Sequence, residues 1–179
     1  MPQYPRLDNA GGLWKLPEIA NYRIGGFWPD VGSRALMGGG REPSASNIID
    51  FVEIASTGNA TDFGDLQSTK YNMAAASNGT RGIFMGGYDG YPNQSNVIGH
   101  VTIDTAGNAA DFGNLTAGRG ATTGMSNRVR GLAAGGGDNT VGYSNVIDHF
   151  AIASLGNAAD FGNLTQSRGQ GSSVNNATR

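Results

Sequence analysis

The sequence predicts an all-β protein built from three tandem repeats of about 49 residues. Glycine is the first indication, because 30 of the 179 residues are Gly, where an average chain has about 7%. The second is charge, since charged residues make up 15% of the chain against about 25% usually. The third is a nine-residue string, Gly-Asn-Ala-x-Asp-Phe-Gly-(Asn/Asp)-Leu, at 58–66, 107–115 and 156–164. This composition excludes coiled coils and charge-expanded disordered chains, and it favours short strands joined by tight turns.

Composition also excludes several classes of site and partner. The chain has no cysteine, so disulfides, thiolate metal sites and cysteine nucleophiles are excluded. Its formal net charge of −2 argues against nucleic acid as a partner, because phosphate binding needs clustered Lys and Arg. No stretch approaches 18 apolar residues, so we expect no membrane partner. The first residues lack the basic start and apolar core of a signal peptide, and we expect synthesis in a cytoplasm.

Residues 1–33 precede the repeats and differ from them in composition, because both tryptophans lie there. Tryptophan and tyrosine are typical anchors of protein interfaces. We therefore expect a docking or capping segment at 1–33. The residues expected to dock on a partner are Trp14, Tyr22, Phe27 and Trp28. The alternative is that these aromatic side chains cover the outer face of the first repeat.

The three repeats fill a β domain at 34–179, with units at 34–80, 81–129 and 130–179. Each unit opens with an arginine and an apolar run that ends in a glycine doublet, at 38–39, 86–87 and 135–136. A basic residue follows each nine-residue string, as Lys70, Arg119 and Arg168.

Each unit is expected to form four short strands. In the second unit they lie at about 81–85, 96–103, 109–115 and 120–125, and the glycine doublet and the Gly-Asn pair supply the turns between them. The string phenylalanines are expected to be buried at equivalent places, as Phe63, Phe112 and Phe161.

This order of apolar run, glycine doublet, apolar strand, Asp-Phe-Gly-x-Leu and basic residue resembles a kelch-type propeller blade. The string phenylalanines stand roughly where kelch repeats carry a tryptophan. The strings Ser-Asn-x-Ile-Asp and Ile-Ala-Ser-x-Gly-Asn-Ala-x-Asp-Phe-Gly-Asn-Leu are similar to tandem repeats in structural proteins of tailed phages, notably those of marine bacteria and cyanobacteria. The resemblance covers 34–179, and the early Leu-Asp-x-Ala-Gly-Gly-Leu-Trp stretch is similar to the start of such proteins.

The resemblance implies a non-enzymatic structural component of a phage virion, assembled in the host cytoplasm as a tail, fibre-associated or capsid-decorating protein. Closed propellers have four to eight blades, whereas the repeats supply three. Two chains closing a six-bladed ring, three sheets packed as a prism, and a longer parent chain are the alternatives. We expect contact with copies of itself or with other virion proteins, burying on the order of 800 Å² per partner.

Catalytic machinery is not expected. His100 and His149 occupy the repeat position of Phe51, which indicates packing rather than catalysis or metal binding. The recurring carboxylates Asp62, Asp111 and Asp160 are expected to bond turn backbone, with calcium or acid–base chemistry as the alternative. Asp50 and Asp148 are replaced by Gly99 in the middle unit, which weakens a chemical role. Because nucleophile-elbow, zinc-protease and P-loop motifs are also absent, we expect no enzyme, no catalytic, cofactor-binding or metal residues and no cofactor.

The loops that follow the glycine doublets differ between repeats, and binding sites on repeated scaffolds usually lie in such loops. Two of them combine tyrosine with Asp and Asn, which suits the apolar face and the hydroxyl groups of a sugar. The expected glycan contacts are Tyr88, Asp89, Tyr91, Asn93, Asp138, Asn139 and Tyr143. The alternative function is therefore a carbohydrate-binding module that recognises host-surface glycans, although the same loops could be solvated or buried against a neighbouring subunit.

Overall fold

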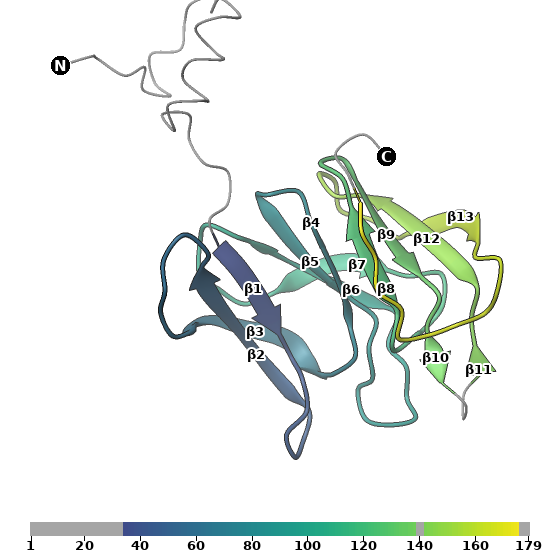
Figure 1. Ribbon diagram of the computed structural model, residues 1–179, viewed down its shortest axis with the longest axis horizontal. Coiled ribbons are helices and arrows are strands. Elements are labelled where there is room, and N and C mark those ends of the chain that lie inside the picture. The colour runs from purple at the N-terminus through teal and green to yellow at the C-terminus, as the bar shows by residue number, and fades with distance from the viewer. Residues whose placement is uncertain (1–33, 139–141, 176–179) are drawn as a thin grey trace, which may run out of the picture. The chain divides into compact units, whose positions relative to one another are not determined.

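The computed structural model describes residues 34–138 and 142–175, and these residues form an all-β structure (Figure 1). Within these ranges there is no helix, and so none that is long and apolar enough to cross a membrane. The prediction of an all-β chain is confirmed.

The strands form three larger antiparallel sheets and one small hairpin. Sheet I has the order β1 (Arg34–Gly38), β2 (Ser46–Glu53) and β3 (Thr61–Lys70). Sheet II has the order β4 (Ala74–Ser77), β5 (Arg81–Met85), β6 (Val97–Thr102) and β7 (Ala110–Asn114). Sheet III contains β8 (Thr123–Ser126), β9 (Arg130–Ala134), β12 (Val146–Ala151) and β13 (Ala159–Asn163), in the order β13-β12-β9-β8. The hairpin pairs β10 (Gly137–Asp138) with β11 (Gly142–Tyr143).

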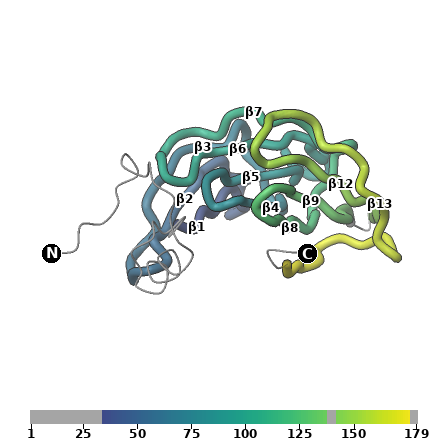
Figure 2. The backbone as a smooth tube through the Cα atoms, turned by 90° about the horizontal axis from the view of Figure 1, so that it is seen from above, coloured from purple at the N-terminus to yellow at the C-terminus, as the bar shows by residue number. Residues whose placement is uncertain are grey.

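The three sheets lie side by side in chain order, and they do not close into a barrel within the described residues (Figure 2). Strand β4 differs from the limits drawn from the sequence, which put 74–77 at the end of the first unit. It pairs with β5, so that Ala74 lies opposite Met85 and Ser77 opposite Gly82. The small residues of β4 suit this place, because the strand also packs on β8 of the next sheet.

The glycine doublet of the first unit also lies one residue later than the sequence analysis placed it. The left-handed φ of about 67° at Gly86 and 64° at Gly135 recurs at Gly39, with 67°, and not at Gly38. Three consecutive glycines, 38–40, hide the register in the sequence. Counting five residues from Arg34, as from the arginines that open the other units, gives the correct doublet, Gly39-Gly40.

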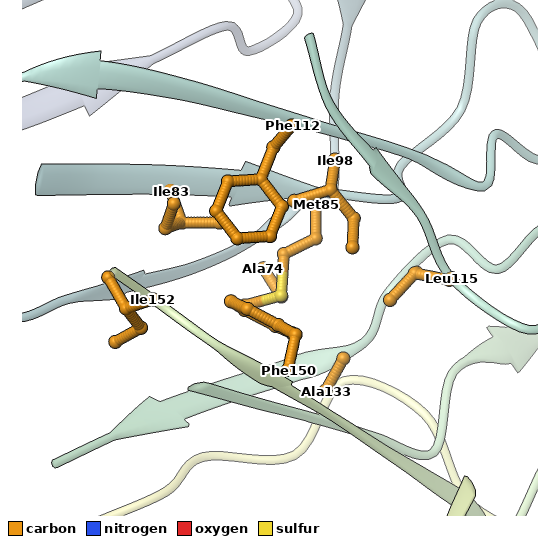
Figure 3. Packing of buried hydrophobic residues seen from close by; sticks show 9 residues of the cluster. All are labelled: Ala74, Ile83, Met85, Ile98, Phe112, Leu115, Ala133, Phe150 and Ile152. Carbon is orange, nitrogen blue, oxygen red and sulfur yellow. The ribbon is translucent and has the colours of Figure 1, made fainter. Parts of the chain in front are cut away.

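Apolar side chains fill the two spaces between neighbouring sheets. Between sheets I and II the buried cluster includes Ile49, Phe63 and Phe84. Between sheets II and III the cluster is larger (Figure 3), and the rings of Phe112 and Phe150 meet edge to face with centroids 5.4 Å apart. Each of these two clusters therefore lies between neighbouring sheets rather than within one sheet.

The prediction for the string phenylalanines holds for two of the three. Phe63 and Phe112 are 2% exposed, whereas Phe161 is 51% exposed, so the expectation of a buried Phe161 was wrong. The reason is positional, since sheet II covers Phe63, sheet III covers Phe112, and no further sheet follows sheet III within the described residues.

Candidate functional site

The repeated string forms the backbone joint between sheets I and II. The N–H of Gly107 donates to the carbonyl oxygen of Phe63, and the N–H of Ala109 donates to that of Asp65, both at 2.7 Å. The side-chain oxygen of Asn108 accepts from the N–H of Asp65 at 2.9 Å. The start of one string is therefore hydrogen-bonded to the end of the preceding string.

The same three bonds join sheets II and III. Gly156 donates to Phe112 and Ala158 donates to Asn114, both at 2.8 Å, while Asn157 accepts from the N–H of Asn114 at 3.0 Å. This reuse gives Gly-Asn-Ala and Phe-Gly-Asn complementary roles, and it explains why the sequence preserves both halves of the string.

A buried ion pair reinforces the joint between sheets II and III. The guanidinium of Arg119 lies 2.5 Å from the Asp148 carboxylate of sheet III and also donates to the carbonyl oxygen of Val146 at 2.8 Å. Asp148 is fully buried, and it accepts two more hydrogen bonds, from the hydroxyl and the N–H of Thr116 at 2.7 and 3.0 Å. A buried charge is tolerated when it is paired and hydrogen-bonded in this way.

The joint between sheets I and II also buries a basic side chain, but different residues surround it. Buried Lys70 donates from Nζ to the hydroxyl of Ser95 at 2.9 Å. Burial lowers the pKa of Lys70, and Asp89, 3.9 Å away, partly opposes that shift. Gly99 stands where sheet III has Asp148, and the side-chain oxygen of Gln67 lies only 2.6 Å from where a Cβ on Gly99 would be. The two joints thus use two matched sets of residues. The first set is Gln67, Lys70 and Gly99, and the second is Thr116, Arg119 and Asp148.

The arginines that open the first two units each make a further contact across the joint to the following sheet. Arg34 of sheet I donates from Nη1 to the carbonyl oxygen of Asp104 at 3.0 Å, just beyond β6. Arg81 of sheet II donates in the same way to the carbonyl oxygen of Ile152 at 2.6 Å, just beyond β12. Both arginines fix the end of the neighbouring sheet's central strand.

Sequence reasoning missed the structural role of Asp148. It considered Asp148 only for a chemical role, which the replacement by Gly99 weakened, and it noted the basic series Lys70, Arg119 and Arg168 separately. The two observations are informative only when they are combined. The unit that follows Lys70 carries Gly99, whereas the unit that follows Arg119 carries Asp148.

The histidines occupy packing positions. His100 meets the ring of Phe112 edge to face at 5.9 Å, His149 meets Phe161 in the same way at 5.8 Å, and Phe51 contacts Phe63 with centroids 6.1 Å apart. Burial, and then Arg81, lower the pKa of His100. The position thus supports the string phenylalanine in each sheet.

The recurring aspartates are exposed at the start of the outer strands. Asp160 accepts from the N–H of Gly162 at 3.2 Å, which is the turn contact expected from the sequence. Over 34–138 and 142–175, no three His, Asp or Glu residues lie together in a way that could hold a metal ion.

The glycan candidates are divided between core and surface. Tyr88 is buried and stacks on Tyr71 of the segment between β3 and β4, with ring centroids 5.4 Å apart, so its ring packs between loops. Tyr91 and Tyr143 are about half exposed. Asp89 and Asn93 are exposed, and Asp89 accepts from Ser68 at 3.1 Å.

The other candidates can be placed only in part. Asp138 is described for its backbone in β10, and Asn139 lies outside the described residues. So do the expected docking residues Trp14, Tyr22, Phe27 and Trp28. No protein-family model matches the chain, and no curated protein is found to be similar to it.

Proposed function

We propose that this chain is a non-enzymatic structural component of a phage virion, a tail, fibre-associated or capsid-decorating protein that acts through protein–protein contacts. The supporting observation is that residues of the repeated string form the hydrogen bonds between neighbouring sheets. Two successive joints reuse the same three backbone and amide bonds. The phage context comes from the similarity of the repeated strings to those of tailed-phage structural proteins.

In this proposal the sheets are kelch-like propeller blades. Sheets II and III each have four antiparallel strands in the same order, and sheet I has the three that correspond to β5, β6 and β7. The lengths and spacing of these strands suit a repeat of about 49 residues, and kelch-type propellers use about 50 residues per blade.

Immunogold labelling of purified particles tests the virion role directly. An antibody raised against the full chain should label one fixed location on every particle, and mass spectrometry should find the chain in purified virions. Trp14→Ala/Trp28→Ala should reduce incorporation, whereas Leu155→Ala, at an exposed loop position, should not. Detection in lysate with absence from purified particles would contradict the virion role.

Binding of host-surface glycans is the second candidate, favoured by the half-exposed ring of Tyr91 and the exposed Asp89 in the same loop. Aromatic faces pack on the apolar side of pyranose rings, and carboxylates bind their hydroxyls. A glycan array probed with the full chain should give binding that Tyr91→Ala abolishes and Leu155→Ala preserves. An array without any hit, or hits that Tyr91→Ala leaves intact, would exclude this function for the loop.

A further inference from the structure

The outer face of sheet I exposes apolar side chains that its neighbours bury. Met37 is 48% exposed and Ile54 is 68% exposed. By strand register, Met37 corresponds to Phe84 and Ala133, and Ile54 corresponds to Ile103 and Ile152. All four counterparts are buried, and Phe84, Ala133 and Ile152 lie in the clusters between neighbouring sheets. Sheet I thus presents the receiving side of a joint with no sheet against it in the described residues.

Sheet III presents the opposite side of a joint. Phe161 is exposed, and Arg168 is exposed although Lys70 and Arg119 are buried. A Cβ at Gly64 or Gly113 would lie about 2.5 or 2.3 Å from a carbonyl oxygen of the next string, whereas one at Gly162 would meet nothing within 4 Å. The counterparts of this end of the string accept N–H groups from the next string on their carbonyl oxygens. At the last string no described residue takes the place of that next string.

The side chains on these two faces complement each other. Thr165 and Arg168 repeat Thr116 and Arg119 at a spacing of 49 residues, and Asp50 holds the position of Asp148. Asp50 is half-buried and forms no ion pair with any described residue. The segment after β13 thus offers the Thr-Arg set, and sheet I offers the Asp that this set pairs with in the second joint. The first joint instead uses the Gln-Lys and Gly set.

We propose that these two faces bind each other between two copies of the chain, with Arg168 of one copy paired with Asp50 of the second. The inference deepens the proposed function, since it rests on the chain acting through protein contacts and names a second copy as the partner. The contact is head to tail, and such contacts close into rings when the rotation between copies permits. Two copies supply six sheets, which is within the four to eight blades of closed propellers.

The last described residues suit this arrangement. Residues 171–175 run beside β8, where the hydroxyl of Thr123 donates to the carbonyl oxygen of Gly171 at 2.8 Å and that of Ser173 donates to Gly124 at 2.6 Å. Ser172 follows Thr123 by 49 residues, so this segment corresponds to β4 and β8. In the ring it lies against β1 of the second copy, as β8 lies against β9. Sheet I then gains the fourth strand that sheets II and III have.

Charge reversal tests the proposal on the full chain. Sedimentation velocity should give a dimer at micromolar concentration, and Arg168→Asp or Asp50→Arg alone should weaken it about tenfold or more, because each places like charges at a desolvated contact. An equimolar mixture of the two variants should restore the dimer, since each mixed dimer has one original and one reversed pair. Arg128→Asp, at an exposed turn, should leave the dimer unchanged.

The mixing step separates a lost contact from a lost fold, because misfolded variants cannot repair each other. A monomer at tens of micromolar would overturn the proposal and assign these faces to another occupant. A dimer that tolerates both reversals, or two weakened variants that mixing does not repair, would overturn it as well. A monomer in sedimentation would not contradict the virion role, which the particle labelling tests separately. Conversely, a chain that is absent from purified particles could still form this dimer, so the two failures are distinguishable.

Discussion

At the scale of single residues, the joint between sheets II and III depends on a buried charge that is compensated by its neighbours. Arg119 lies in the segment between β7 of sheet II and β8 of sheet III, and Asp148 lies in β12 of sheet III. Removing one partner of a buried pair leaves the other charge desolvated, which costs more than the pair itself contributes. The pair thus determines which sheet faces fit together more than it adds net stability.

Asp148→Ala should lower the free energy of unfolding by about 3–5 kcal/mol, because Arg119 is left buried without its carboxylate. Urea denaturation measures the loss, with Asp104→Ala at an exposed position as the matched control. The triple variant Thr116→Gln/Arg119→Lys/Asp148→Gly, which copies the residue set of the first joint, should recover much of it. A triple variant less stable than Asp148→Ala would contradict the matching of the two sets.

His100 should make stability depend on pH. Burial and Arg81 lower the pKa of His100 from its ordinary 6.5, so below pH 6.5 the unfolded chain binds a proton that the folded chain resists. Stability is therefore fully present above 6.5 and falls as pH drops from 6.5 toward the lowered folded pKa. His100→Phe, which places the residue of sheet I at this site, should reduce that slope in urea titrations at several pH values. An unchanged slope in His100→Phe would contradict the assignment of this pH dependence to His100. His149→Phe, at the equivalent position of sheet III, is the comparison variant.

At the scale of strands, the sequence locates elements better than it assigns them to sheets. β5 begins and ends as predicted, and β6 and β7 differ from prediction by one residue at each end, because apolar alternation and turn residues are local signals. The sheet that β4 joins could not be read in this way, since its small residues fit either neighbouring unit. The joints escaped prediction because they depend on pairs of residues, such as Arg119 and Asp148, that only the packed sheets bring together.

The glycine of the repeated string allows a matched test of the joint. Gly113 and Gly162 have φ of about 147° and 140°, so alanine strains the backbone at both, by roughly 1–3 kcal/mol. Only at Gly113 would the Cβ also clash with the carbonyl oxygen of Gly156. Gly113→Ala should therefore destabilise the dilute protein clearly more than Gly162→Ala in thermal unfolding. Equal losses would show that strain, not close approach between sheets, determines the need for glycine.

At the scale of the whole molecule, identical residues have different surroundings because, within the described residues, no sheet follows sheet III. The string is nearly the same in the three units, so the sequence predicts one burial for Phe63, Phe112 and Phe161. Burial depends on the next sheet in space, and that information is not contained in the string. The exposure of Phe161 therefore reflects the lack of a following sheet among the described residues rather than a property of strand β13.

Truncating the two phenylalanines should separate folding from association. Phe112→Ala should cost about 3–5 kcal/mol at any protein concentration, because it removes a buried ring from the core between sheets II and III. Phe161→Ala should change the stability of the dilute monomer by about 1 kcal/mol or less, since its ring is half exposed. At concentrations where the wild-type chain associates, Phe161→Ala should lower the melting temperature relative to wild type, because burial in a partner stabilises the folded state by mass action. Denaturation measured at two concentrations checks both, and a large loss for Phe161→Ala in the dilute protein would place that ring in the core of a single chain.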